Sequence, residues 1–275
     1  MVNLSFLRKP LCAAVAAFLP LACASDPEPV AAGDDQQLIG GTAESRYLGV
    51  GYLADAAKPT TPLCGATLIA PNVAVTAAHC AYRNRTKTLV FGVGELKAQT
   101  QYAIAETVYH PDGHLEPTSK IDLVHTLLLY DVAYVVLTKP VANAEPLGVP
   151  TTKPALQCNV RLVGYGPSGS GTTPIRKGVD GCAVLNAKLA SDTIVEVRPK
   201  MGGAVCHRDG DEGHAAVVLD AKGKPQLLGL YVGSVTQGLT DCKKFVQLLN
   251  GYEASFGFQA FYAKGIARGK QVLGQ

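Results

Sequence analysis

The sequence predicts an all-β protein, and three features of the chain point to that fold class. Its 275 residues include 29 glycines and 17 prolines, the residue types that form tight turns between short strands. Long stretches with the apolar spacing of a helix are few, whereas short apolar or alternating runs are frequent. Because 47% of the residues are hydrophobic, the chain can bury a substantial core in one or two compact units, and disorder of the whole chain is excluded.

The first element is an export signal. Residues 1–9 form a short basic region, 11–21 an apolar run and 22–24 a small-residue cleavage pattern, which together predict a secretory signal peptide over 1–24. The apolar run is too short to span a bilayer, so no transmembrane segment is expected.

A lipid anchor is the alternative to plain secretion. Residues 21–23 also match a bacterial lipoprotein processing site, in which Cys23 is lipidated and becomes the first residue. Either route exports the protein, which is then secreted or periplasmic, or lipid-anchored at a bacterial cell envelope. The polar, acidic residues 25–37 are expected to form a leader or tether.

Short apolar or alternating runs then follow along the chain and predict strands. They lie at 47–53, 66–75, 88–93, 102–109, 131–137, 158–165, 182–185, 193–197, 215–219 and 226–232. Residues 245–262 carry aromatic and aliphatic side chains at close to helical spacing, which predicts a helix. The proline-containing segment 143–152 is expected to connect two halves of the chain.

One histidine stands at the end of an apolar strand. The run 66–75 is followed by two alanines, so little side-chain bulk surrounds His79, and Cys80 can pin the turn beneath it. A histidine in such a position is more often structural than catalytic. Asp131 makes a catalytic role of His79 more plausible. An aspartate that opens an otherwise apolar strand needs a partner to offset its desolvation, and an imidazole is one such partner.

Four further short motifs accompany this pair along the chain, namely Leu38-Ile39-Gly40-Gly41, Cys64-Gly65, His110-Pro111 and Gly164-Tyr165-Gly166. With them, the chain resembles the trypsin/chymotrypsin family of serine proteases (peptidase S1) from about residue 38 to 262. The resemblance implies two Greek-key six-stranded β-barrels, about 38–143 and 151–262, and a C-terminal helix packed across the second barrel. Residues 263–275 then form a mildly basic, solvated tail.

The resemblance also assigns roles to the histidine and the aspartate. In this family the cleft between the barrels brings together a histidine, an aspartate and a serine, here His79, Asp131 and residue 212. The aspartate fixes the tautomer of the histidine, which removes the hydroxyl proton, and backbone N–H groups hold the oxyanion.

The loop that carries the nucleophile departs from the family pattern of Cys, one residue, and Gly-Asp-Ser-Gly-Gly-Pro. Gly210, at the oxyanion-loop position, Asp211 and Gly213 fit, but Glu212 occupies the serine position, and two extra residues separate Cys206 from Gly210. A glutamate cannot replace the hydroxyl, because its carboxylate has no proton to give the histidine and would form an anhydride. Loss of a triad member costs roughly 10⁴- to 10⁶-fold in turnover.

The resemblance also implies an activation step. In the family's zymogens, cleavage creates a new amino terminus that pairs with the aspartate before the serine, here Leu38, at the start of the motif 38–41, and Asp211. Gln36 and Gln37 precede the motif, so a trypsin-like activator has no Lys or Arg to cut after.

Six cysteines remain after the leader, an even number that suits an oxidising compartment and allows fifteen pairings. The resemblance implies that Cys64 pairs with Cys80 behind the histidine, and Cys206 with Cys242 beside the nucleophile loop. The two others, Cys158 and Cys182, are equally far from Ser170 in a turn-rich stretch, so a hairpin there would set them opposite each other.

The primary specificity pocket is also atypical. Counting back from Cys206 places Ala204 at its base, with walls near Val232, Gly233 and Ser234. An uncharged base predicts a small or apolar pocket, or simple packing, rather than a preference for Lys or Arg.

Three functions are weighed on these grounds. The leading hypothesis is an exported pseudoprotease that binds a protein or peptide in the cleft between the barrels. The second is an active serine endopeptidase in which another serine, such as Ser234, approaches His79. The third uses side chains of suitable type as ligands for a divalent metal, namely His79, His207, Glu212 and His214.

No cofactor or metal is expected, because the spacing of those four residues matches no metal motif and solvated loop side chains explain them better. Without the leader the chain has 23 basic and 22 acidic residues, a net charge of +1. A near-neutral balance without a basic block predicts no nucleic-acid partner.

Overall fold

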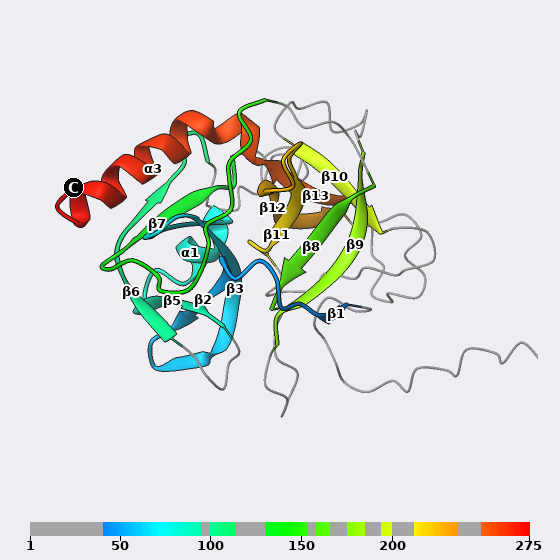
Figure 1. Ribbon diagram of the computed structural model, residues 1–275. Coiled ribbons are helices and arrows are strands. Elements are labelled where there is room, and N and C mark those ends of the chain that lie inside the picture. Colours follow the sequence, from blue (N-terminus) through cyan, green and yellow to red (C-terminus); the bar gives the residue numbers. More distant parts are fainter. Residues whose placement is uncertain are drawn as a thin grey trace, which may run out of the picture. The chain divides into compact units, whose positions relative to one another are not determined.

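The computed structural model describes residues 41–94, 100–113, 130–152, 158–165, 175–184, 194–199, 212–235 and 249–275 (Figure 1). All of them belong to one compact unit, residues 34–275. The predicted signal peptide 1–24, with Cys23, and the predicted leader or tether 25–37 fall outside the described residues. Within the described ranges, no helix combines the length and the apolar character that a membrane span requires.

Six antiparallel strands close the first barrel, as predicted. They pair in the order β2-β3-β4-β7-β6-β5. Their bounds are β2 Val50–Asp55, β3 Lys58–Ala70, β4 Val73–Thr76, β5 Leu89–Val93, β6 Thr100–Tyr109 and β7 Ala133–Leu137. Inward-facing side chains such as Leu68, Phe91 and Val135 are fully buried in its core, and burial of this kind is the main favourable term in folding.

The second sheet contains β8 Val160–Gly164, β9 Lys177–Val184, β10 Ile194–Pro199, β11 Ala215–Leu219, β12 Pro225–Val235 and β13 Leu249–Ala254. β8 pairs with both β9 and β11, so the pairing runs through these six strands and returns to β8. A two-residue strand, β1 (Thr42–Ala43), also pairs with β9. This short strand lies in the range 38–143 expected for the first barrel, but it pairs with the second sheet.

A shared core connects the two sheets. Val75 and Val132 of the first barrel belong to the same buried cluster as Ala215 and Leu230 of the second sheet. Asp131 directly precedes Val132, and His79 follows Val75 by four residues, so the shared core fixes the backbone next to both.

The C-terminal helix differs from the prediction in position and in contacts. Residues 249–254 form β13, residues 255–258 a 3₁₀ turn (η2, Ser255–Phe258), and the helix α3 spans Gln259–Val272. The segment 263–275, expected as a solvated tail, is thus mostly helical.

Helix α3 packs on β7, β3 and β4 of the first barrel rather than across the second (Figure 1). Gly265 and Gly269 allow this approach, since a Cβ at Gly265 would lie 2.9 Å from the ring of Tyr134. Asn72 donates to the carbonyl of Gly269 (2.9 Å), which holds the end of the helix on the barrel.

Two disulfides lie within the described residues. Cys64 of β3 is bonded to Cys80, and Cys158 to Cys182 of β9. Both pairs agree with the sequence predictions, whereas Cys206 and Cys242 fall outside the described residues.

Candidate active site

His79 is the second residue of a short helix, α1 (Ala78–Arg83), that follows β4. The two alanines before it, Ala77 and Ala78, are completely buried. Larger side chains would not fit between the barrel wall and this turn, so the small residues let the helix begin directly at the end of the strand. The His79 side chain remains 16% exposed and is therefore accessible from one side.

Asp131 holds His79 through two contacts and the preceding residue, Ala78, through a third. Its Oδ2 lies 2.5 Å from His79 Nδ1, its Oδ1 accepts the backbone N–H of His79 (2.8 Å), and its carbonyl accepts the N–H of Ala78 (3.1 Å). Asp131 is only 5% exposed. A carboxylate that accepts from Nδ1–H leaves Nε2 as the nitrogen that can exchange a proton.

The segment 212–214 docks its backbone onto β3. Gly65 donates its N–H to the carbonyl of Glu212 (2.7 Å), and Gly213 donates to the carbonyl of Tyr231 (2.7 Å). The hydroxyl of Thr76 donates to the carbonyl of Gly65 (2.7 Å) and so holds in place the residue that donates to Glu212.

Two glycines make the docking possible. A Cβ at Gly65 would lie 2.5 Å from the backbone nitrogen of His214, and a Cβ at Gly213 would lie 2.2 Å from the carbonyl oxygen of Gly65. Gly213 also has a φ of +81°, which L side chains rarely adopt. Both glycines belong to sequence motifs of the family, but those motifs alone do not predict that the two residues contact each other.

The docking brings residue 212 to the dyad. The Sγ of Cys80 lies 3.7 Å from Nε2 of His79 and also 3.7 Å from the carbonyl oxygen of Glu212. The proton-exchanging nitrogen of His79 and the backbone of Glu212 therefore meet around one disulfide sulfur.

The family model described as "Trypsin" matches residues 39–245, which is most of the chain. The chain belongs to the trypsin family. A snake venom serine protease, serpentokallikrein-1 of Protobothrops mucrosquamatus, is 30% identical over 107 residues. That match spans 38% of this chain and only 38% of the relative's length.

A solved structure supports the fold of this trypsin-family chain. Neuropsin, a serine protease expressed in the limbic system of mouse brain, aligns with a TM-score of 0.61 at 14% sequence identity. The alignment covers 82% of this chain and 98% of neuropsin. Together with the six-stranded barrel and the C-terminal helix, it confirms the trypsin fold.

His214, a suggested metal ligand, is completely buried in this trypsin-family chain. Its ring stacks on Tyr231, with centroids 5.0 Å apart, and its carbonyl accepts the N–H of Tyr231 (3.0 Å). Among the described residues, His, Cys, Asp and Glu side chains form no group of three that could hold a metal ion. His207 falls outside those residues.

Several predicted site residues of the trypsin pattern also fall outside the described residues, namely Ala204, Gly210, Asp211 and the motif 38–40. The expected pocket walls belong to β12, where Val232 is buried. Gly233 and Ser234 pair with Gly251 and Asn250 of β13, and nothing is described of their side chains.

Proposed function

We propose that this trypsin-family protein is an exported pseudoprotease that acts by binding a protein or peptide. The identity of residue 212 supports this most strongly: the residue whose backbone docks beside His79 and Cys80 is a glutamate, where the family pattern has serine. A carboxylate supplies neither the hydroxyl proton nor the acyl acceptor that peptide hydrolysis requires.

The proposed binding site is the cleft between the barrels, where the family binds its substrates. The retained Asp131 supports this proposal, because it holds both the ring and the backbone of His79 in place. Two disulfides in the described residues suit export to an oxidising compartment, whether secreted, periplasmic or lipid-anchored through Cys23.

An active endopeptidase is the second candidate. The 2.5 Å contact between His79 Nδ1 and Asp131 Oδ2 favours it, since this pair can still orient a general base. It needs another nucleophile, such as Ser234, whose backbone is committed to the pairing of β12 with β13.

Labelling with a serine-directed fluorophosphonate separates the two candidates. The pseudoprotease predicts no labelling of the purified mature protein above the level of a His79→Ala variant. Stoichiometric labelling that disappears in the His79→Ala variant would establish the endopeptidase instead.

A further inference from the structure

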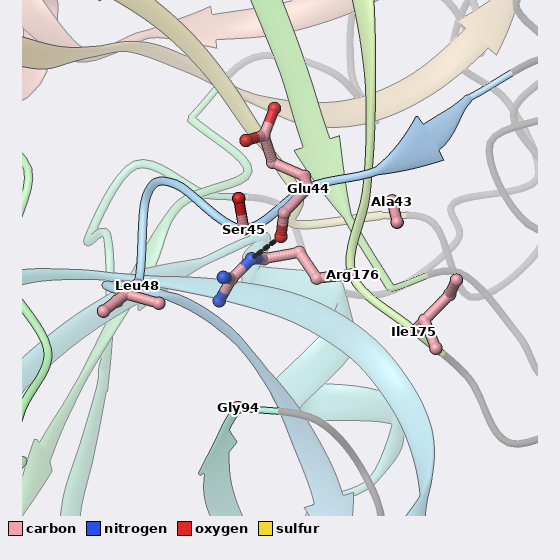
Figure 2. A pocket seen from close by; sticks show the side chains of 7 residues that line it. All are labelled: Ala43, Glu44, Ser45, Leu48, Gly94, Ile175 and Arg176. Carbon is pink, nitrogen blue, oxygen red and sulfur yellow. Dashed lines mark hydrogen bonds between the residues drawn. The ribbon is translucent and has the colours of Figure 1, made fainter.

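A second site lies away from the dyad, where the chain leaves β1 and approaches β9. It is a cavity of about 450 Å³ in the size range of small-ligand pockets. It is lined by Ala43, Glu44, Ser45, Leu48, Gly94, Ile175 and Arg176 (Figure 2). Neither His79 nor Asp131 lines it, so it is distinct from the candidate active site.

Arg176 presents a buried donor at this cavity. The residue is only 8% exposed, and its Nε donates to the carbonyl of Glu44 (3.0 Å), as the dashed line in Figure 2 marks. Its Nη1 is buried and has no hydrogen-bond partner among the residues that the structure describes. A guanidinium keeps its charge under all ordinary conditions, and a buried charged donor without an acceptor is costly.

The neighbouring carboxylates are occupied by other arginines. Glu44 accepts from Nε of Arg46 (2.9 Å) and from Nε of Arg161 (2.7 Å), and Arg161 also donates to Asp180 (3.0 Å). Figure 2 shows the Glu44 carboxylate turned away from the Arg176 guanidinium. Of the three guanidinium groups of Arg46, Arg161 and Arg176, that of Arg176 is the one without a carboxylate partner among the described residues.

The rim of the cavity is apolar. Leu48 is 46% and Ile175 39% exposed, and Leu219 is the other large hydrophobic side chain exposed in the described part of the chain. Two such side chains beside one cavity favour a ligand with an apolar portion. The hydroxyl of Ser45, which also lines the cavity, is a further donor for an anion.

We propose that this cavity binds a carboxylate carried on an apolar group, either a free small acid or the C-terminus of a peptide with an apolar last residue. A carboxylate matches the charge of Arg176 and accepts directly from a guanidinium. A doubly charged phosphate fits less well, because it carries more negative charge than the one guanidinium of Arg176 offsets. The site shares no residue with the dyad, so it does not depend on the pseudoprotease proposal.

Isothermal titration calorimetry on the mature protein at low ionic strength tests this site. The probes are hexanoate and the peptide acetyl-Ala-Ala-Leu with a free C-terminus, each compared with its amide. We expect hexanoate, the peptide or both to bind. The amide of each acid that binds should bind at least about tenfold more weakly, since the amide carries no charge. Binding of hexanoate alone points to a free acid, and tighter binding of the peptide points to a C-terminus.

Two variants connect the binding to the cavity. Arg176→Gln removes the buried charge, and Leu48→Glu places a carboxylate on the exposed rim without disturbing the core; each should weaken binding at least about tenfold. Leu219→Glu, on a 52% exposed leucine of β11 outside the cavity, is the matched control and should bind as the wild type does.

Three results would overturn the proposal. The first is no binding of either acid up to about 10 mM, in which case solvent water alone satisfies Arg176. The others are equal binding of acids and amides, and equal binding by the Leu48→Glu and Leu219→Glu variants. The exposed rim variant keeps the test decisive if Arg176→Gln fails to fold.

Discussion

The carboxylate of Glu44 is expected to stabilise the fold, and Glu44→Gln removes its charge at constant size. The side chain is only 3% exposed and accepts hydrogen bonds from Arg46 and Arg161. Burial alone raises the pKa of Glu44, but the hydrogen bonds from the two arginines outweigh it and lower the pKa from 4.5 to about 2.

The shift sets the expected magnitude. At about 1.4 kcal/mol per pKa unit, a carboxylate with this pKa contributes at most about 3.5 kcal/mol at neutral pH. Arg46 is 62% exposed, so solvent screens its share, while Arg161 is only 16% exposed. We therefore expect Glu44→Gln to lower the free energy of unfolding by about 2 kcal/mol at pH 7.

The pH dependence follows from the direction of the shift. A lowered pKa in the folded state stabilises the protein above the unfolded value of 4.5, and this stabilisation is lost as the pH falls toward 2. The difference between wild type and Glu44→Gln should therefore shrink across that interval.

Urea denaturation followed by circular dichroism at a series of pH values measures this difference. The exposed Glu145 supplies the control, and Glu145→Gln should leave the stability unchanged. A difference below about 0.5 kcal/mol at pH 7, or one that stays constant down to pH 2, would refute the reasoning.

Two further predictions concern the docked backbone and the partly buried His110. Gly65→Ala should lower the free energy of unfolding by at least about 2 kcal/mol in urea melts, since its Cβ meets the backbone of segment 212–214. Burial lowers the pKa of His110 and outweighs the negative charge of Asp112, which raises this pKa. The positive charge of Lys264 lowers it further. The neutral form is thus favoured in the folded state, and the melting temperature should fall as the pH drops below 6.5, the ordinary value.

Matched variants control both predictions. Gly223 has a φ of +75° but no atom within 4 Å of a Cβ, so Gly223→Ala isolates the backbone strain and should cost only about 1 kcal/mol. His110→Phe keeps the aromatic packing on Tyr130 and Phe258 but cannot titrate. An equal cost at Gly65 and Gly223, or the same loss of melting temperature on acidification in His110→Phe, would contradict these expectations.

Local patterns were sufficient to predict most of the strands. The run 215–219, bounded by polar and glycine residues, matches β11 at both ends. Residues 249–254 were predicted as helix because their apolar spacing satisfies a helical period. Pairing with β10 on one side and β12 on the other makes them a strand, and such non-local pairing overrides local propensity.

Part of the candidate site could be predicted from the sequence as well, and part could not. The partnership of His79 and Asp131 was predictable, because a buried carboxylate needs a partner and the sequence offers a histidine at a strand end. The docking of Gly65 and the orphan donor of Arg176 were not, since each depends on segments that are far apart in the chain. No periodicity or spacing records how closely such segments approach.

Hydrolysis of a fluorescently labelled, denatured protein by the purified mature chain tests the loss of the nucleophile most directly. A His79→Ala variant prepared in the same way controls for contaminating protease. The pseudoprotease proposal predicts equal, background-level cleavage by both proteins. Cleavage by the wild type that disappears with His79 would show that a nucleophile other than residue 212 exists, and would contradict it.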